Sequence, residues 1–189
     1  PRSISPKRRS PRSMRTPSTH LEVAKNLIEL IKYRDEIVKQ LPDEYTIRLF
    51  KSAIKESFNK SLRQKTHLHK RLVLDEFGDE HDHAIPLEFI FQAAEKYLDE
   101  KRLTKILKRC LISIRVSRLN HQRLHATHSP KLPGRQDLLR CDLLGRYRKC
   151  FGENVEKQLK HQLDNRKNVI TYIIEPLPTR KSQILLETV

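Results

Sequence analysis

Residues 99–127 read DEKRLTKILKRCLISIRVSRLNHQRLHAT, and this stretch decides the predicted fold. Its apolar residues recur at intervals of three and four positions, as they do along one side of an α-helix, and Asp99 is a suitable N-cap. We therefore expect a long helix over residues 100–126. Its buried side would consist of Leu103, Ile106, Leu107, Cys110, Leu111, Ile114 and Leu124.

The same stretch belongs to a strongly basic segment. Residues 101–136 contain ten lysines and arginines and no acidic residue. A helix with this much uncompensated charge needs counter-charge from outside, which the phosphates of a nucleic acid can supply. The acidic residues around 75–82, an acidic protein partner and plain solvation of the basic face are the alternatives. The predicted nucleic-acid-binding residues are Lys101, Arg102, Lys105, Lys108, Arg109, Arg115, Arg118 and Arg123.

Charge is also concentrated at the start of the chain. The 189 residues have a net charge of +16, and residues 1–19 contribute six basic groups and no acid, whereas 20–100 and 137–189 are nearly balanced. Two concentrated cationic regions on a balanced body are typical of a polyanion-binding protein. Residues 101–136 contain no Phe, Tyr or Trp that could stack on bases. We therefore expect contacts to the phosphate backbone of a duplex or of structured RNA, with little readout of bases. DNA is the preferred partner over RNA.

Apolar spacing and capping residues predict the other helices. Thr19 and Glu22 fit a capping box that opens a helix over 20–41, and further helices are expected over 44–63, 86–98, 136–151 and 153–165. Residues 66–84 lack a helical period and are interpreted as an exposed loop. The apolar runs 169–174 and 184–186 predict a C-terminal β-hairpin.

These elements define three regions. Residues 1–18 are predicted to be a disordered basic arm rich in Ser and Pro, 19–166 a helical domain, and 167–189 a β-hairpin or a tail that pairs with a partner. The expected fold class is mainly α: an irregular bundle of about six helices with a small C-terminal β-hairpin. The presence of only four glycines also favours helices over a turn-rich β fold.

The arm contains three serine or threonine residues followed by proline. Ser5 lies in Ser5-Pro6-Lys7-Arg8, which fits the pattern of proline-directed kinases, and Ser10 and Thr16 carry the core of that pattern. Each phosphate adds about two negative charges, so three phosphates would nearly cancel the charge of the arm. We predict phosphorylation at Ser5, Ser10 and Thr16 as a control of binding. Lys7-Arg8-Arg9 fits a nuclear import signal, which favours the nucleus over the mitochondrion.

Nine histidines invite a search for a metal site. His67-Leu68-His69 and His81-Asp82-His83 place histidines two positions apart, and Glu76 or Asp79 could complete a ligand set. However, no cysteine is near and the surrounding segment is interpreted as a mobile loop, whereas tight zinc sites show fixed ligand spacing. We interpret these histidines as exposed loop residues and predict neither a metal nor a cofactor.

The sequence also gives little support for catalysis or a membrane. It contains no G-x-x-x-x-G-K-[ST], G-x-G-x-x-G or G-x-S-x-G motif, and its three cysteines follow helical spacing without a C-x-x-C pair. No apolar run approaches the ~20 residues of a membrane span. We therefore predict a non-enzymatic protein with no small-molecule substrate and no membrane association.

Together these features predict a nuclear DNA- or chromatin-associated adaptor or scaffold that binds phosphates through a basic helix and joins a larger protein complex. Two other functions remain open. One is an RNA-clamping subunit of a ribonucleoprotein such as an organellar ribosome. The other is a helical module for protein–protein interaction alone.

Overall fold

The computed structural model describes residues 18–127 and 137–165. Seven α-helices and a three-stranded sheet make up these residues, so the predicted mainly α class is confirmed. Ser5, Ser10 and Thr16, most of the predicted arm and the predicted hairpin over 167–189 lie outside the described residues. The boundaries of the three regions stay predictions.

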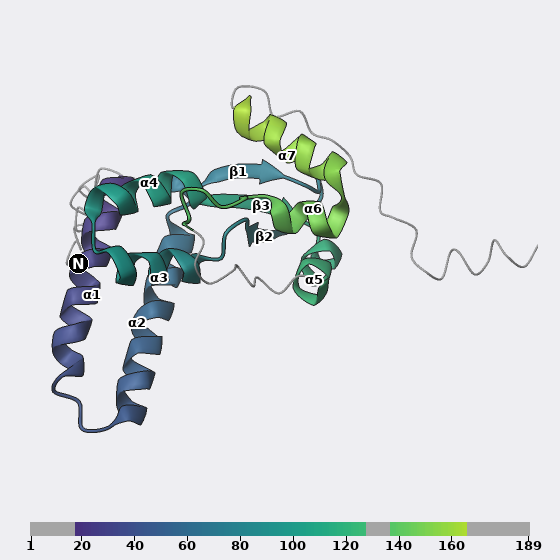
Figure 1. Cartoon of the computed structure of the whole chain (residues 1–189). Helices are drawn as coiled ribbons and strands as arrows, with labels where there is room; N and C mark the ends of the chain where they lie inside the picture. Colours follow the sequence, from purple (N-terminus) through teal and green to yellow (C-terminus); the bar gives the residue numbers. More distant parts are fainter. Residues whose placement is uncertain (1–17, 128–136, 166–189) are drawn as a thin grey trace, which may run out of the picture.

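Helices α1 (His20–Val38) and α2 (Glu44–Gln64) form an antiparallel hairpin whose far end projects from the body (Figure 1). The predicted capping box is present at the start of α1. The Glu22 amide donates to Thr19 Oγ1 at 3.2 Å, and the Thr19 amide donates to Glu22 Oε2 at 2.6 Å. Asp43 caps α2 by accepting from the Thr46 amide at 2.9 Å. Both helices are confirmed, and the first ends three residues earlier than predicted.

Helices α3 (Leu87–Tyr97) and α4 (Glu100–Cys110) pack against the base of this hairpin. The predicted third helix is thus confirmed. Apolar side chains of the four helices share one core, which includes Leu27, Ile31, Phe58, Leu62, Ile90, Phe91, Ile106 and Leu107.

The predicted helix over 100–126 is wrong. Helix α4 ends at Cys110, strand β3 (Ile112–Val116) follows, and helix α5 (Arg118–Thr127) begins after one further residue. The apolar positions 111 and 114 fit a helical spacing, but Ile112, Ile114 and Val116 also alternate with Ser113 and Arg115. This alternation of β-branched residues suits a strand, and pairing with two neighbouring strands stabilises it.

Residues 66–84 are likewise more ordered than an exposed loop. They form a 3-10 turn (Thr66–Leu68) and the strands β1 (Lys70–Val73) and β2 (Glu80–His83). Strand β3 lies between them, parallel to β1 and antiparallel to β2. At Gly78, before β2, a Cβ atom would come within 2.5 Å of the Val116 backbone, so this close approach requires glycine.

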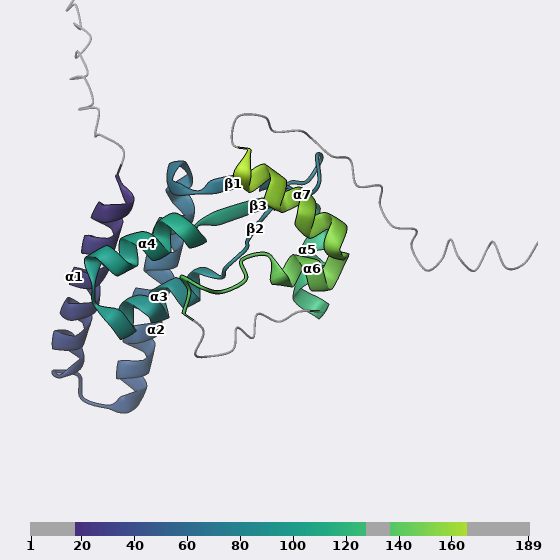
Figure 2. The ribbon, with the colours of Figure 1, turned by 45° about the horizontal axis from the view of Figure 1, so that its top comes forward.

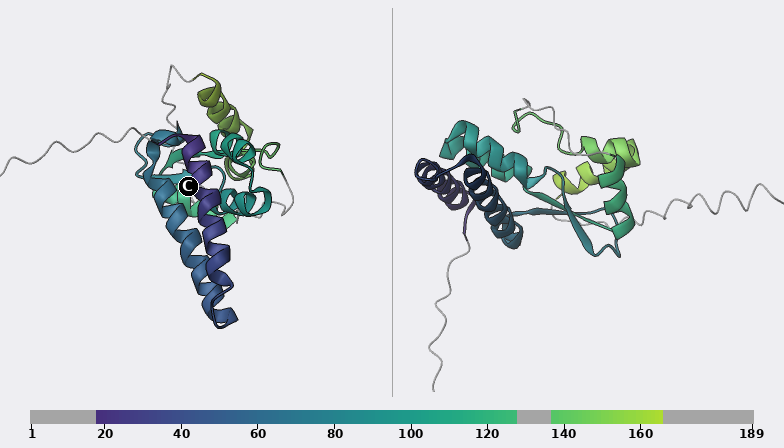
Figure 3. Two further views of the ribbon diagram at one scale, coloured as in Figure 1. Left: turned by 90° about the vertical axis from the view of Figure 1, so that its left-hand side faces the viewer. Right: turned by 90° about the horizontal axis from the view of Figure 1, so that it is seen from below.

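The sheet lies between the α1–α4 group and the group formed by α5, α6 (Gly145–Phe151) and α7 (Glu153–Asp164) (Figures 2 and 3). One face contributes Leu72 and Ile114 to a second core with Leu124, Tyr147 and Leu159. The register places Arg71, Ser113 and His83 side by side at alternate positions, so the other face is polar.

The predicted helix over 136–151 is only partly correct. Residues 137–144 form turns, and α6 begins at Gly145. Asp137 favours a turn because its carboxylate accepts from the Leu139 amide at 3.1 Å. Leu138 and Cys141 are buried against the first core. Helix α7 matches the prediction for 153–165 within one residue.

Candidate metal centre in a basic cavity

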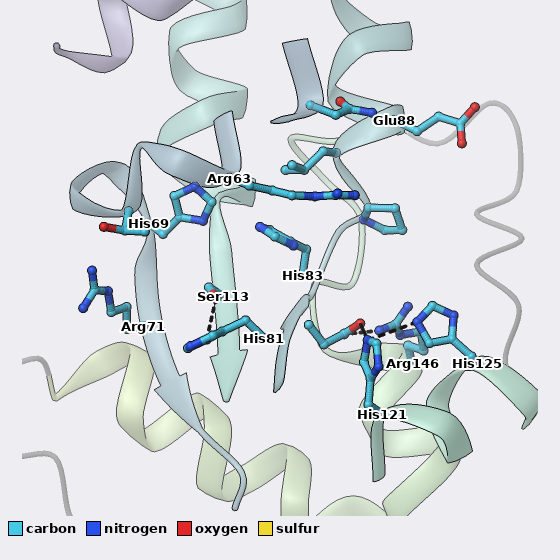
Figure 4. A pocket seen from close by; sticks show the side chains of 15 residues that line it. Arg63, His69, Arg71, His81, His83, Glu88, Ser113, His121, His125 and Arg146 are labelled. Atoms are coloured by element: carbon cyan, nitrogen blue, oxygen red, sulfur yellow. Dashed lines mark hydrogen bonds and ion pairs between the residues drawn. The ribbon is translucent and has the colours of Figure 1, made fainter. Parts of the chain in front are cut away.

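A cavity of about 690 Å³ extends from the polar face of the sheet past its edge strand β2 (Figure 4). Its walls come from α2, all three strands, α5 and α6, so residues distant in sequence meet there. In Figure 4, His121 and His125 lie beside Arg146, apart from His69 and His83. The polar lining includes Arg63, His69, Arg71, His81, Asp82, His83, Ser113, His121, His125 and Arg146.

Three of these side chains could hold one metal ion. Asp82, His121 and His125 each offer a ligand atom, and the three atoms lie within 4.8 Å of one another. The histidines are four positions apart on α5, which places them on one side of the helix. Asp82 comes from β2 and is buried, whereas His121 is part-exposed and His125 exposed. Solvent therefore reaches the ligands.

The spacing of the nitrogens fits a shared ion. His121 Nε2 and His125 Nε2 are 3.2 Å apart, and His121 Nε2 lies 3.7 Å from Asp82 Oδ1. Two imidazoles bound to one ion at ~2.0–2.1 Å, with ligand angles near 90–110°, have nitrogens roughly 3.0–3.4 Å apart. Two histidines and one carboxylate suit Zn²⁺ or a neighbouring divalent transition metal, and such sets leave coordination positions open for water or substrate.

Groups behind Asp82 fix its orientation. Its Oδ2 atom accepts hydrogen bonds from the Arg146 guanidinium and the Tyr147 hydroxyl, which leaves Oδ1 toward His121. Burial, and then the charge of Asp82, raise the pKa of Tyr147 well above its usual value, so the phenol stays protonated and donates. Partners of this kind hold a ligating carboxylate in place and tune its affinity for a metal.

Further histidines line the same cavity, apart from this triad. Burial, with His69 as the next cause, lowers the pKa of His83 to about 4. The two rings meet edge to face at 5.2 Å between centroids. His81 Nδ1 lies 3.4 Å from Ser113 Oγ. At neutral pH the His83 imidazole is therefore uncharged.

The cavity also carries more arginine than carboxylate. Arg63, Arg71 and Arg146 line it, against Asp82 and Glu88, and Glu88 is paired with Lys55 at 2.8 Å. The Nε atom of Arg146 is buried and has no hydrogen-bond partner among the described residues. Arginine donors in a fork suit phosphate oxygens, so the cavity is chemically matched to a phosphate group beside a cation.

The eight cations predicted from the sequence do not form one stripe, because they lie on α4, β3 and α5. None of them lines this cavity, although Lys108 lines a second one. Arg102 pairs with Asp137 at 3.0 Å and lies over the Tyr97 ring at 3.7 Å.

The remaining predicted cations differ in their surroundings. Arg109 donates to the carbonyls of Leu138 and Cys141 at 3.2 and 2.8 Å, which ties the 137–144 segment to α4. Lys101, Lys105 and Lys108 are exposed on α4, and Arg118 and Arg123 are exposed on α5. Arg115 is half-buried on β3. Whether these residues bind nucleic acid stays a prediction.

Sequence reasoning missed the triad for two reasons. His121 and His125 were placed on a long helix, and their i, i+4 spacing, a signal for ligands on one helical side, was not used. Asp82 was assigned to an exposed loop, whereas it is a buried strand residue. Asp82 and the two histidines are also about forty residues apart in the sequence, so no local pattern indicates that they are in contact.

Comparison of the chain with protein-family models, with curated proteins and with solved structures finds no match. Within the described residues, no helix combines the length and the apolar character needed to cross a lipid bilayer. The functional conclusion therefore depends on the geometry of the cavity.

Proposed function

We propose that this protein is a metal-dependent hydrolase of phosphodiester bonds in nucleic acid, with its active site in the cavity beside β2 and α5. The observation that carries this proposal is the convergence of Asp82, His121 and His125 within 4.8 Å in a cavity lined by arginines.

The chemistry follows from what each group can do. Asp82, His121 and His125 would hold a divalent cation, which would supply Lewis-acid stabilisation for the charge that develops on a phosphate during hydrolysis. Arg146, which lies beside the two histidines, would hold a non-bridging phosphate oxygen through a charged hydrogen bond, and Arg63 and Arg71 add positive charge elsewhere in the cavity. His83 adds an uncharged imidazole to the same cavity, which can accept a hydrogen bond from a bound water.

Charge supports a polyanionic substrate. The chain carries a net charge of +16, and the predicted affinity for a phosphate backbone is compatible with a site that acts on that backbone. The cavity is part-open to solvent at His121 and His125, as access by a polymer requires.

The non-enzymatic adaptor predicted from the sequence is the second proposal, and the exposed Lys101, Lys105 and Lys108 on α4 support it. Both proposals include phosphate binding. They differ in whether a cation at Asp82 and a chemical step are needed, so metal dependence separates them. The predicted nuclear localisation and control by phosphorylation belong to the second proposal and are independent of the cavity.

The decisive experiment replaces one histidine of the triad and compares this variant with one in which an exposed histidine outside the cavity is replaced. Metal-free protein is titrated with Zn²⁺, Mn²⁺ and Mg²⁺ by calorimetry, and hydrolysis of bis(4-nitrophenyl) phosphate and of plasmid DNA is followed. His125→Ala should lower cation affinity about a hundredfold or more, since losing a group that only orients a ligand already costs 10- to 100-fold. Hydrolysis should fall with it.

His161→Ala is the control, because His161 is an exposed histidine on α7 that does not line the cavity. It should leave both measurements unchanged. Because His125 is exposed, its replacement should not prevent folding, which circular dichroism would verify. A wild-type protein that binds none of these cations, or a His125→Ala variant that hydrolyses both substrates normally, would contradict the proposal.

A further inference from the structure

A second cavity of about 500 Å³ lies next to the first along the edge strand β1. It is walled by the 66–68 turn, β1 and parts of α1, α4 and α7. His69 and Arg71 line both cavities, so the two spaces share a wall. The first cavity is therefore one end of a longer polar surface.

The lining of the second cavity is basic without a compensating acid. Lys70, Arg71 and Lys108 contribute positive charge, His20 and His67 add imidazoles, and no carboxylate lines it. By contrast, Asp82 and Glu88 line the first cavity. Within the described residues, the side chains of Arg71 and Lys108 form no hydrogen bond or ion pair. Such a concentration of positive charge favours an anionic ligand.

The surroundings of His20 show that this charge converges. Burial lowers the pKa of His20, and Lys108, His67 and Lys70 lower it further by repulsion. The imidazole is held by a contact of 3.1 Å between its Nε2 atom and the Leu68 carbonyl. A phosphate placed here would relieve the repulsion between these groups.

Gln162, the polar residue that α7 contributes to this cavity, already has hydrogen-bond partners. The Gln162 amide donates to the Val73 carbonyl at 2.9 Å and accepts from the Val73 amide at 2.8 Å. This pair of bonds ties α7 to β1, and Arg71 and Lys108 are the charged groups of this cavity that we expect to bind a ligand. Leu68, Leu72 and Leu163 supply an apolar floor.

We infer that the second cavity binds a second phosphodiester of the strand whose reacting phosphodiester occupies the first cavity, with Arg71 lining both cavities. This inference rests on the proposed function and deepens it, because it makes the substrate a polynucleotide rather than a small phosphate ester. A substrate with one phosphodiester would gain nothing from the second cavity.

The test uses Lys108→Glu, with Lys105→Glu as its matched control. Both lysines are exposed on α4, but only Lys108 lines the second cavity. Binding of a fluorescein-labelled 20-nucleotide single strand is measured by anisotropy in EDTA against salt concentration. Lys108→Glu should weaken binding about tenfold at low salt, and Lys108→Ala should reduce the salt slope by about one. Lys105→Glu should change affinity less than threefold.

Hydrolysis supplies the second measurement. Lys108→Glu should raise the KM for the oligonucleotide and leave kcat/KM for bis(4-nitrophenyl) phosphate within twofold of wild type. Equal effects of the two glutamate variants on binding would overturn the inference, since they would indicate a diffuse field. An equal loss on both substrates would also overturn it. If the wild type hydrolyses neither substrate, the proposed function fails, and a selective loss of binding in Lys108→Glu still supports a phosphate site here.

Discussion

The cavity wall formed by β2, α5 and α6 and the outer side of α4 are both rich in charged residues, yet they hold them differently. On the cavity wall, the side chains of Asp82 and Arg146 are 6% and 10% exposed and contact each other. On α4, Arg102 is 36% exposed and its partner Asp137 31%. Counting charged residues along a sequence therefore locates charged surfaces. A reactive site, by contrast, forms where charged groups from separate segments are buried together.

The largest expected difference between the two regions is in the free energy of unfolding lost by the variants Arg146→Met and Arg102→Met. Removal of Arg146 leaves Asp82 buried without its cation, which typically costs about 3–5 kcal/mol of the free energy of unfolding. Removal of Arg102 should cost about 1 kcal/mol, because part-exposed ion pairs and cation–π contacts contribute little. Urea unfolding of both variants in EDTA measures the two losses, and similar losses would remove the distinction.

Acid should act on the cavity wall through His83. Its pKa is lowered from 6.5 to about 4 in the folded protein, so between these values the unfolded state binds more protons than the folded state. This histidine's contribution to stability is complete above pH 6.5 and is lost as the pH falls toward 4. The loss should reach about 3 kcal/mol, at 1.36 kcal/mol for each pH unit.

His83→Gln should remove that part of the pH dependence. His20 and His69 also have lowered pKa values and act in the same direction, so the wild-type curve should not be flat even without His83. The difference between wild-type and variant unfolding curves at pH 7, 6, 5 and 4, all in EDTA, isolates the effect. A difference that is constant over this range would contradict the assignment.

The smallest expected effect comes from the start of the α1–α2 hairpin. Thr19→Ala removes the side-chain bond of the capping box and should lower the free energy of unfolding by about 1 kcal/mol. Because Thr19 does not line the cavity of the triad, affinity for a cation should stay the same. This variant thus separates a loss of stability from a loss of the site, and weaker cation binding in it would show that the two are coupled.

Local signals in the sequence predicted the elements that depend on local interactions. Thr19 and Glu22 identified the start of α1, and apolar spacing identified α2, α3 and α7 within a few residues. Strand β3 was missed because residues 111–116 fit both a helical and an alternating pattern. Pairing with β1 and β2, which decides between the two patterns, is a tertiary interaction that no single stretch reveals.

The candidate site was harder to predict for the same reason. The pair His121 and His125 was visible as an i, i+4 pattern, and His81-Asp82-His83 was recognised as a group with metal-binding residue types. What joins them is the antiparallel pairing of β2 with β3, followed directly by α5. The buried contacts of Asp82 with Arg146 and Tyr147 depend in turn on where α6 packs.

The central position of β3 has a consequence for folding. Its two neighbours in the sheet precede it by about thirty to forty residues, so no short fragment can assemble the three ligands. A peptide of α5 alone carries two imidazoles but lacks the carboxylate that only a docked β2 provides. Cation binding should therefore require the complete sheet. By mass action, the bound ion should stabilise the folded protein relative to partly folded forms.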